Sequence, residues 1–207
     1  MCSSDLVSVA SWPESGWQMD ASFLNYVLLG PDFRNLLALG SDEQLMREYF
    51  DKHAGKPPSR AVSRITDLGD SIMTAIVLAP FGKASTRFTD LGRLRVQECE
   101  RVVALRTELT KCGAKVIETG DTLEVFPSQL HGATIETYND HRMAMCFAIL
   151  GLKVAGIKIK NPACVKKTFP NFFQKLAAAP PHGLGATILD ATVTPPRPLA
   201  HEELFAD

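Results

Sequence analysis

The chain has 207 residues, enough for one large domain or two small ones with an apolar core, so a disulfide-dependent miniprotein is excluded. Hydrophobic residues make up 45% and charged residues 22%, which excludes a largely disordered chain. The formal net charge of -1 gives no overall field that would favour nucleic acid or an anionic membrane, so any anionic ligand must be bound by local cations.

The cysteines and the apolar runs indicate a cytoplasmic protein. The five cysteines form no Cys-x-x-Cys pair and are dispersed through apolar segments, as is usual for reduced thiols. The longest apolar runs, residues 72–81 and 143–152, are only about half as long as a membrane-spanning helix. No basic region followed by an apolar run opens the chain, so we expect no secretory signal. We therefore expect neither membrane nor nucleic acid as a partner.

The first half of the chain is predicted to contain three helices. Ser41 opens the first with a capping box, and apolar residues recur at helical spacing to residue 53. The second, over residues 70–80, is nearly all apolar after its N-cap at Asp70 or Ser71, so we expect it to be buried. The third, over residues 96–112, has apolar residues along one side.

The second half mixes strands with helices. Two alternating runs, residues 115–119 and 122–126, flank Gly120-Asp121, whose composition is typical of a hairpin turn. A strand, a helix, a strand and a helix are then expected over residues 133–137, 141–152, 156–160 and 170–178. This alternation predicts an α/β or α+β domain.

The two ends of the chain are expected to lie outside this domain. Residues 179–207 hold five of the 13 prolines and no sustained periodicity, so we predict an extended or mobile Pro-rich tail. Residues 1–17 give no clear pattern and are treated as an N-terminal segment of uncertain origin. The folded domain is then expected in residues 18–178.

Charged and polar residues gather where the predicted helices begin. The residues concerned are Asp70, Arg93, Arg95, Glu98, Arg101, His141, Arg142, Lys166 and Lys167. A helix N-terminus carries unpaired N–H groups and a positive dipole end, so cations there are misplaced unless an anion joins them. This pattern indicates an anion-binding site. No metal-binding or serine-nucleophile motif accompanies it.

Each of these residues also has an ordinary structural interpretation. Asp70 can be a plain N-cap, and Glu98 with Arg101 can form a surface ion pair at i, i+3. His141 can be a buried histidine with satisfied hydrogen bonds, and Lys166-Lys167 can be a solvated face. Taken singly, none of them identifies an enzyme.

Three motifs together narrow the interpretation. They are Arg95-Val96-Gln97-Glu98-Cys99-Glu100-Arg101 with Thr107-Glu108-Leu109, then Tyr138-Asn139-Asp140-His141-Arg142-Met143-Ala144-Met145, then Lys167-Thr168-Phe169-Pro170. In order and interval they resemble the 5-enolpyruvylshikimate-3-phosphate synthase family. The resemblance is strong over residues 67–176 and covers only the C-terminal half of the family's sequence.

The resemblance implies a fold, a reaction and substrates. The fold is an enolpyruvyl-transferase-type α/β domain of repeated βαβαββ units, here incomplete. The reaction transfers the enolpyruvyl group of phosphoenolpyruvate to the 5-hydroxyl of shikimate 3-phosphate, in aromatic amino acid biosynthesis, without metal or organic cofactor. The missing N-terminal domain of the same enzyme is an implied partner, so we expect negligible turnover by the isolated chain.

The resemblance also implies roles for individual residues. Asp70 binds the shikimate hydroxyls and takes the proton of the attacking 5-hydroxyl, and Glu98 protonates the methylene carbon of phosphoenolpyruvate. Arg101 and Arg142 bind phosphoenolpyruvate, because planar guanidiniums suit carboxylate and phosphate. Lys167 is a further contact that can carry a proton. Guanidiniums around one carboxylate and apolar cover on the other would separate their pKa values as these duties require.

Three substrate-binding positions complete the implied site. His141 matches a histidine that orients or hydrogen-bonds the substrates. Gln97 stands where the family usually has Lys, so one phosphoshikimate contact loses its charge. Arg93 stands where an Asn often contacts the shikimate group, and we hypothesise that it compensates for Gln97.

Two other functions stay open. The related transferase that acts on UDP-N-acetylglucosamine is disfavoured by the block from Asn139 to Arg142. A noncatalytic anion-binding relic of the fold is supported by Gln97 and by the missing half.

Overall fold

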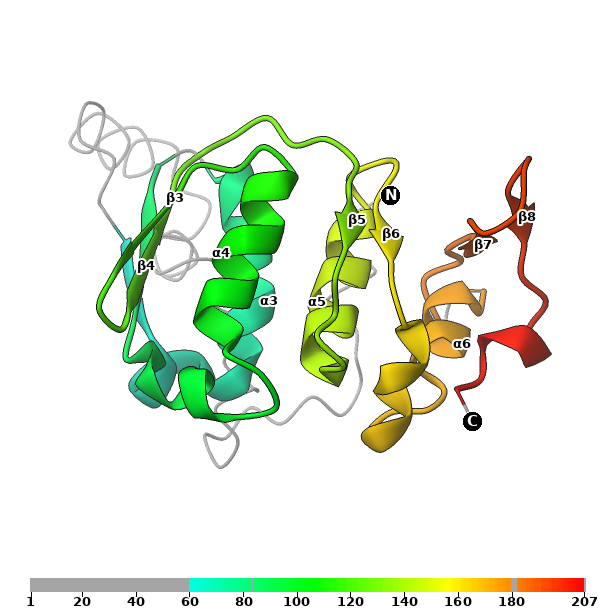
Figure 1. Ribbon diagram of the computed structural model, residues 1–207, viewed down its shortest axis with the longest axis horizontal. Coiled ribbons are helices and arrows are strands. Elements are labelled where there is room, and N and C mark those ends of the chain that lie inside the picture. Colours follow the sequence, from blue (N-terminus) through cyan, green and yellow to red (C-terminus); the bar gives the residue numbers. More distant parts are fainter. Residues whose placement is uncertain (1–59, 83, 180–181, 207) are drawn as a thin grey trace, which may run out of the picture.

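The computed structural model describes residues 60–82, 84–179 and 182–206 (Figure 1). The helix expected over residues 41–53 and the N-terminal segment 1–17 lie outside these ranges. Within them, the order strand, helix, strand, helix, strand, strand occurs twice.

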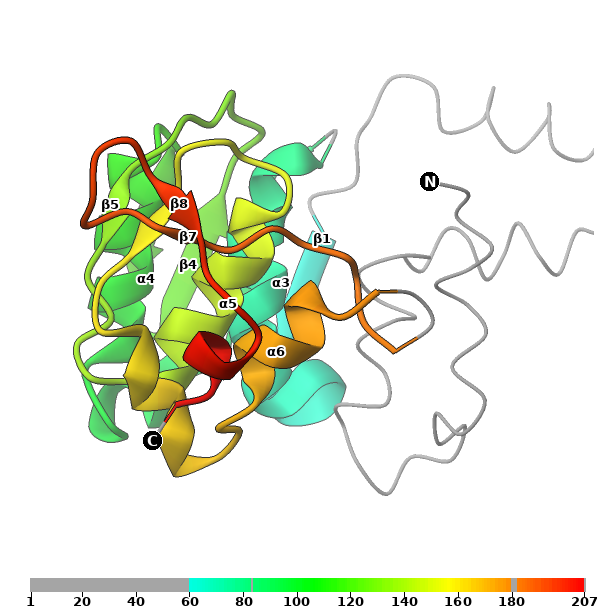
Figure 2. The same cartoon turned by 90° about the vertical axis from the view of Figure 1, so that its right-hand side faces the viewer.

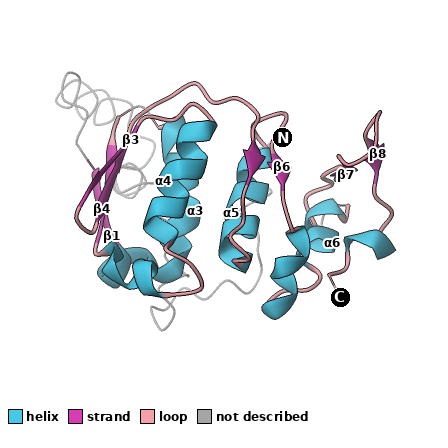
Figure 3. Ribbon diagram, viewed as in Figure 1, coloured by secondary structure: helices cyan, strands magenta, loops and turns pink. Residues whose placement is uncertain are grey.

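The first of these two units forms a four-stranded sheet with two helices. Its elements are β1 (Arg60–Ser63), α3 (Ile72–Leu78), β2 (Thr86–Thr89), α4 (Arg101–Lys111), β3 (Val116–Thr119) and β4 (Thr122–Val125). The strand order is β1-β2-β4-β3, with β1 parallel to β2 and β4 antiparallel to both of its neighbours. Short helical turns are η3 (Arg64–Leu68), η4 (Gly69–Ser71), η5 (Ala79–Phe81) and η6 (Leu91–Val96). Figure 3 shows α3 and α4 on one side of this sheet.

The second unit repeats the order with much shorter strands. Its elements are β5 (Thr134–Ile135), α5 (His141–Gly151), β6 (Lys158–Ile159), η7 (Pro162–Lys167), α6 (Phe172–Ala177), β7 (Leu189–Asp190), β8 (Arg197–Pro198) and η8 (Glu202–Leu204). Here β5 and β6 pair in parallel and β7 and β8 pair antiparallel, as two separate sheets. The α/β fold of repeated units is therefore confirmed, with the second unit less complete than the first.

Helix α5 lies between two hydrophobic cores. Met143, Phe147 and Leu150 join the first core, which the four-stranded sheet, α3 and α4 complete. Ala144 faces the second core, formed with η7 and α6. Both faces of α5 are therefore buried against other elements, which explains why this helix is apolar on most of its sides. Among the described residues, no helix is long and apolar enough to span a membrane.

The segment after α6 packs against this helix. Leu199, Leu204 and Ala206 belong to or pack against the second core, and η8 lies beside α6 (Figure 2). The N–H of Ala206 donates to the carbonyl of Pro170 at 2.9 Å. The sequence predicted an extended or mobile tail here. Residues 182–206 hold little regular structure, but dispersed apolar residues pack them against α6, without any periodic pattern that the sequence would reveal.

Most predicted elements of the described ranges are confirmed, with shorter bounds. The hairpin turns at Gly120, whose φ of 55° favours glycine. Helix α4 begins at Arg101 rather than at residue 96, since η6 ends at Val96, residues 97–100 are not helical, and the Glu100 side chain caps the helix by accepting from the N–H of Val103.

Candidate active site

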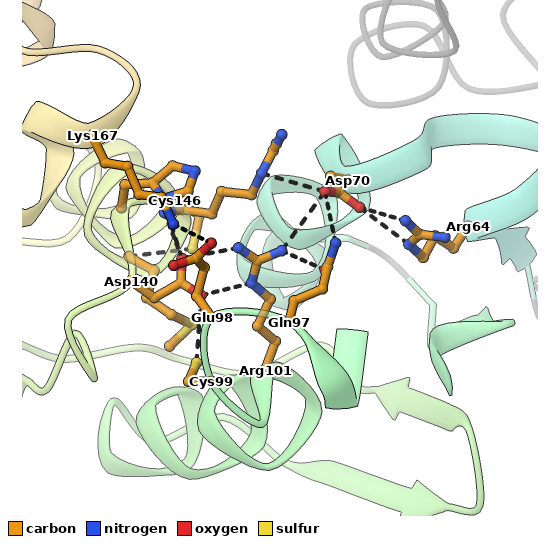
Figure 4. Close-up of polar contacts among 12 residues, drawn as sticks. Arg64, Asp70, Gln97, Glu98, Cys99, Arg101, Asp140, Cys146 and Lys167 are labelled. Atoms are coloured by element: carbon orange, nitrogen blue, oxygen red, sulfur yellow. Dashed lines mark hydrogen bonds and ion pairs between the residues drawn. The ribbon is translucent and has the colours of Figure 1, made fainter. Parts of the chain in front are cut away.

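Helices α3, α4 and α5 begin at the same end of the molecule, where η7 also lies (Figure 1). Asp70 precedes α3, Arg101 opens α4, and His141 opens α5. Lys167 ends η7. The topology thus brings together side chains that are up to about a hundred positions apart in the sequence (Figure 4).

A tight turn aims the first residues of α5 into this site. Tyr138 and Asn139 both have left-handed backbone, with φ of 54° and 56°. Asp140 then caps α5, its Oδ1 accepting from the N–H of Arg142 at 2.8 Å. The cap fixes the direction in which His141 and Arg142 leave the helix.

Arg101 and Asp140 form a buried ion pair at the centre of the site. Arg101 is 2% exposed and Asp140 is fully buried. The Arg101 Nε and Nη2 donate to the two carboxylate oxygens at 2.6 and 3.2 Å, and Nη1 donates to Oε1 of Gln97. Burial alone would raise the pKa of Asp140, but the bond and charge of Arg101 hold it below its usual value.

Asp70 is surrounded by guanidinium groups. Its Oδ1 accepts from Nη2 of Arg64 at 2.6 Å, and its Oδ2 lies 3.4 Å from Nε of Arg142 and 3.7 Å from Nη1 of Arg101. Gln97 Nε2 donates to Oδ2 at 3.4 Å. Burial pushes the pKa of Asp70 up, but the Arg64 bond and the three positive charges outweigh burial and hold the pKa below its usual value. Asp70 is therefore ionised, and its carboxylate is not occupied as a simple N-cap.

Glu98 and Lys167 join the two units at the rim. Lys167 Nζ donates to Oε1 of Glu98 at 2.5 Å, and both side chains are partly exposed. The bond from Lys167 is the main cause that lowers the pKa of Glu98. The apolar cover that we expected on one carboxylate is therefore absent at Glu98, and the bond from Lys167 favours the ionised form of this carboxylate.

His141 is buried beside these groups. It is 6% exposed, and its Nδ1 lies 4.0 Å from Oδ1 of Asp140 without a hydrogen-bond partner among the described residues. Burial is the main cause that lowers its pKa, so the ring is neutral near pH 7. The satisfied buried histidine that we considered is thus not what is found.

Arg93 is not part of this cluster. It is exposed on η6 and is not among the residues that contact Asp70. Its neighbour Arg95 also points elsewhere, binding Glu118 and Asp121 of the β3–β4 hairpin. Glu98 pairs with Lys167 and Arg101 with Asp140, so the surface ion pair between Glu98 and Arg101 is not formed.

Three residues of or near the site were missed as contributors. Asp140 stands before an apolar helix and could have been identified as its N-cap. Glu108 is fully buried and accepts a hydrogen bond from the Tyr138 hydroxyl at 2.8 Å. The sequence does not indicate this burial, because a charged residue in an amphipathic helix is expected on the solvent face. The position of Arg64 beside Asp70 depends on the turn η3, which no pattern in the sequence predicts.

No group of three or more His, Cys, Asp or Glu side chains that could hold a metal ion occurs within the described ranges. The four described cysteines, Cys99, Cys112, Cys146 and Cys164, are free thiols. The candidate site brings together carboxylates, guanidiniums, a lysine and a neutral imidazole.

Two carboxylates and several cations lie at the helix N-termini of this α/β chain of repeated units. This arrangement is that of an anion-binding domain. The family model for EPSP synthase (3-phosphoshikimate 1-carboxyvinyltransferase) matches residues 44–176, more than half of the sequence. The chain therefore belongs to the EPSP synthase family.

Two curated relatives agree with this assignment. The chain is 42% identical over 111 residues to the 3-phosphoshikimate 1-carboxyvinyltransferase of Nostoc punctiforme, covering 54% of this chain and 26% of the relative. It is 44% identical over 145 residues to that of Psychromonas ingrahamii, covering 69% and 33%. A solved EPSP synthase from Acinetobacter baumannii aligns with a TM-score of 0.48 and 28% identity over 51% of this chain and 26% of that one. The chain thus spans about a quarter to a third of the length of these curated relatives.

Proposed function

We propose that this chain provides one wall of an active site that transfers the enolpyruvyl group of phosphoenolpyruvate to the 5-hydroxyl of shikimate 3-phosphate. The observation that carries the proposal is the convergence of Asp70, Arg101 and Arg142 at the N-termini of α3, α4 and α5. The named relatives favour this substrate over UDP-N-acetylglucosamine.

The arginines are suited to bind phosphoenolpyruvate. Arg142 is 35% exposed at its side chain, so its guanidinium is accessible to a carboxylate or phosphate. Arg101 is held by Asp140 and keeps Nη1 toward Gln97 and Asp70. Fixed cations of this kind stabilise negative charge that develops during reaction without needing to reorganise.

The two carboxylates divide the proton transfers. Asp70, ionised and partly buried, accepts the proton of the attacking hydroxyl while the hydroxyl oxygen bonds to the central carbon of phosphoenolpyruvate. The methylene carbon receives a proton from the Glu98–Lys167 pair, which gives a tetrahedral adduct. The C–O bond to the phosphate of this adduct then breaks, the pair takes one proton back from the new methyl group, and the double bond re-forms. The proton taken by Asp70 leaves with the phosphate. His141, neutral and beside this pair, orients the substrate by a hydrogen bond.

The chain requires the rest of the enzyme for activity. Holding two reactants in one geometry can lower a barrier by roughly 7 to 11 kcal/mol, and this needs both walls of a cleft. We place the assembled enzyme in the cytoplasm, where the free thiols persist. The isolated chain should release phosphate from phosphoenolpyruvate at a negligible rate.

Complementation tests the proposal. The part of the Psychromonas ingrahamii relative that this chain does not cover is co-expressed with the full chain, and phosphate release that needs both substrates is measured. We expect turnover that Glu98→Gln abolishes and that Glu202→Gln, at an exposed glutamate of η8, leaves unchanged. A folded complex that shows no turnover with either Glu98 or Gln at this position would instead support the noncatalytic relic, for which the uncharged Gln97 is the favouring observation.

A further inference from the structure

Arg64 and Asp70 stand at the two ends of a wide turn that follows β1. The N–H of Gly69 donates to the carbonyl of Arg64, which closes the turn η3. Gly69 has φ 54° and ψ -137°, a conformation that residues with a Cβ rarely adopt. The turn therefore depends on glycine, and it places two residues six positions apart side by side.

The two oxygens of the Asp70 carboxylate have different surroundings. Both Nε and Nη2 of Arg64 donate to Oδ1, at 3.2 and 2.6 Å. Oδ2 instead faces Gln97, Arg101 and Arg142 across 3.4 to 3.7 Å. Figure 4 shows Arg64 on the far side of Asp70 from Arg101. One oxygen is thus anchored, and the other is directed into the candidate active site.

We propose that Arg64 is a positioning residue for Asp70, which it anchors through Oδ1 so that Oδ2 is presented to the substrate hydroxyl. This inference rests on the proposed function. Arg64 also provides the positive charge beside Asp70 that Gln97 does not.

Three cations from three different elements pair with Asp70. Arg64 comes from η3, Arg101 from α4 and Arg142 from α5, while Gln97 adds a neutral amide. Burial favours the protonated carboxyl, and these cations oppose it. Arg64 is the nearest of them, so its removal leaves burial less opposed and the carboxyl free to rotate. A protonated Asp70 cannot accept the hydroxyl proton.

Carboxyl NMR titration of the full chain tests the assignment. With 13C-labelled aspartate, the Asp70 signal is identified by its loss in Asp70→Asn. We expect Arg64→Gln to shift the Asp70 midpoint to higher pH, and Arg64→Lys to shift it less because the charge is kept and one of the two donors is lost. Arg87→Gln, at an exposed arginine of β2, removes the same charge elsewhere and should leave the midpoint unchanged.

An unchanged Asp70 midpoint in Arg64→Gln would overturn the inference. If that variant does not fold, Arg64→Lys decides the question, since a midpoint identical to that of the unsubstituted chain would show that the two-donor anchor has no effect. Equal upward shifts in Arg64→Gln and Arg87→Gln would also overturn it, because they would report only the lost net charge.

The complemented enzyme separates this inference from the proposed function. Arg64→Gln should move the acidic limb of the kcat/KM profile to higher pH, and Arg64→Lys should restore part of the shift. Turnover with an unchanged profile in Arg64→Gln would refute the role of Arg64 and leave the function standing. A shifted Asp70 midpoint without any turnover by the unsubstituted complex would refute the function and leave the positioning role standing.

Discussion

Arg101 holds the carboxylate of Asp140 through two bonds, Nε to Oδ2 at 2.6 Å and Nη2 to Oδ1 at 3.2 Å, where neither side chain is accessible to water. Asp140 caps α5 with the same carboxylate. One acidic residue therefore fixes the start of α5 relative to the start of α4, and with it the separation between Arg142 and Arg101.

Asp140→Asn should destabilise the chain strongly. Removing one partner of a buried ion pair leaves the other charge uncompensated, which costs about 3 to 5 kcal/mol. Urea unfolding of the full chain measures this loss. Arg106→Gln breaks an ion pair to Glu118 whose arginine is 43% exposed, and it should cost less than about 1 kcal/mol. If the two variants lost similar amounts of unfolding free energy, the buried Arg101–Asp140 pair would contribute no more to stability than an exposed ion pair.

His141 should make stability depend on pH in the range where histidine titrates. Its pKa in the folded chain lies below the usual 6.5, so the unfolded chain binds the proton more readily between the two values. Stability therefore falls as pH decreases through and below 6.5. Unfolding free energies between about pH 8 and about pH 5 measure this slope. His141→Gln should flatten it, whereas His182→Gln, at an exposed histidine, should not.

Lys167 should control the protonation of Glu98. Its ammonium donates to Oε1 of Glu98 and lowers the pKa of this carboxyl. Lys167→Gln should therefore raise the pKa of Glu98 toward its ordinary value of 4.5, and a carboxyl NMR titration would detect the change. Lys175→Gln, at an exposed lysine of α6, is the matched control. A Glu98 midpoint that ignores Lys167→Gln would mean that the pair is not formed in solution.

The local parts of this fold could be predicted from sequence, and the long-range parts could not. The hairpin at Gly120 and the start of α5 follow from turn and capping residues within a few positions. The pairing of Arg101 with Asp140 joins residues 39 positions apart, and no local sequence pattern indicates it. Arg64 lies outside the quoted motifs, and its role follows only from the geometry of η3.

The packing of the C-terminal segment shows a second limit of sequence reasoning. Its buried residues are isolated in loops and in one short 3-10 turn, so they produce neither a helical nor an alternating pattern. Prolines dominated the prediction, although proline is compatible with a fixed, extended chain as well as with a mobile one. Contact with α6 decides between these two states, and this contact is a tertiary property.

Leu204→Ala tests whether the C-terminal segment is part of the folded domain. Leu204 is 6% exposed in the second core, so its truncation leaves a cavity and should cost about 2 kcal/mol or more. Leu189→Ala removes the same atoms from a side chain that is 49% exposed, and it should have little effect. Urea unfolding of both variants gives the comparison. Equal, small effects would mean that residues 182–206 do not pack as described.

Glu108→Gln should loosen the turn that precedes α5. The buried carboxylate accepts from the Tyr138 hydroxyl at 2.8 Å, from the N–H of Glu136 at 3.1 Å and from Nζ of Lys111 at 2.7 Å. An amide has one acceptor oxygen in place of two and directs an NH2 group at one of these donors, so a buried group loses its partner at a cost of about 1 to 3 kcal/mol.

The effect of Glu108→Gln should be local as well as global. Amide hydrogen exchange should accelerate at Tyr138 and Asn139, whose left-handed backbone is held by these bonds, before it accelerates in the four-stranded sheet. Lys111→Gln removes the exposed partner of Glu108 and leaves the bonds to Tyr138 and Glu136, so exchange in the turn should stay slow. If both variants accelerate exchange equally, the charge of Lys111 rather than the buried carboxylate holds the turn that directs His141 and Arg142.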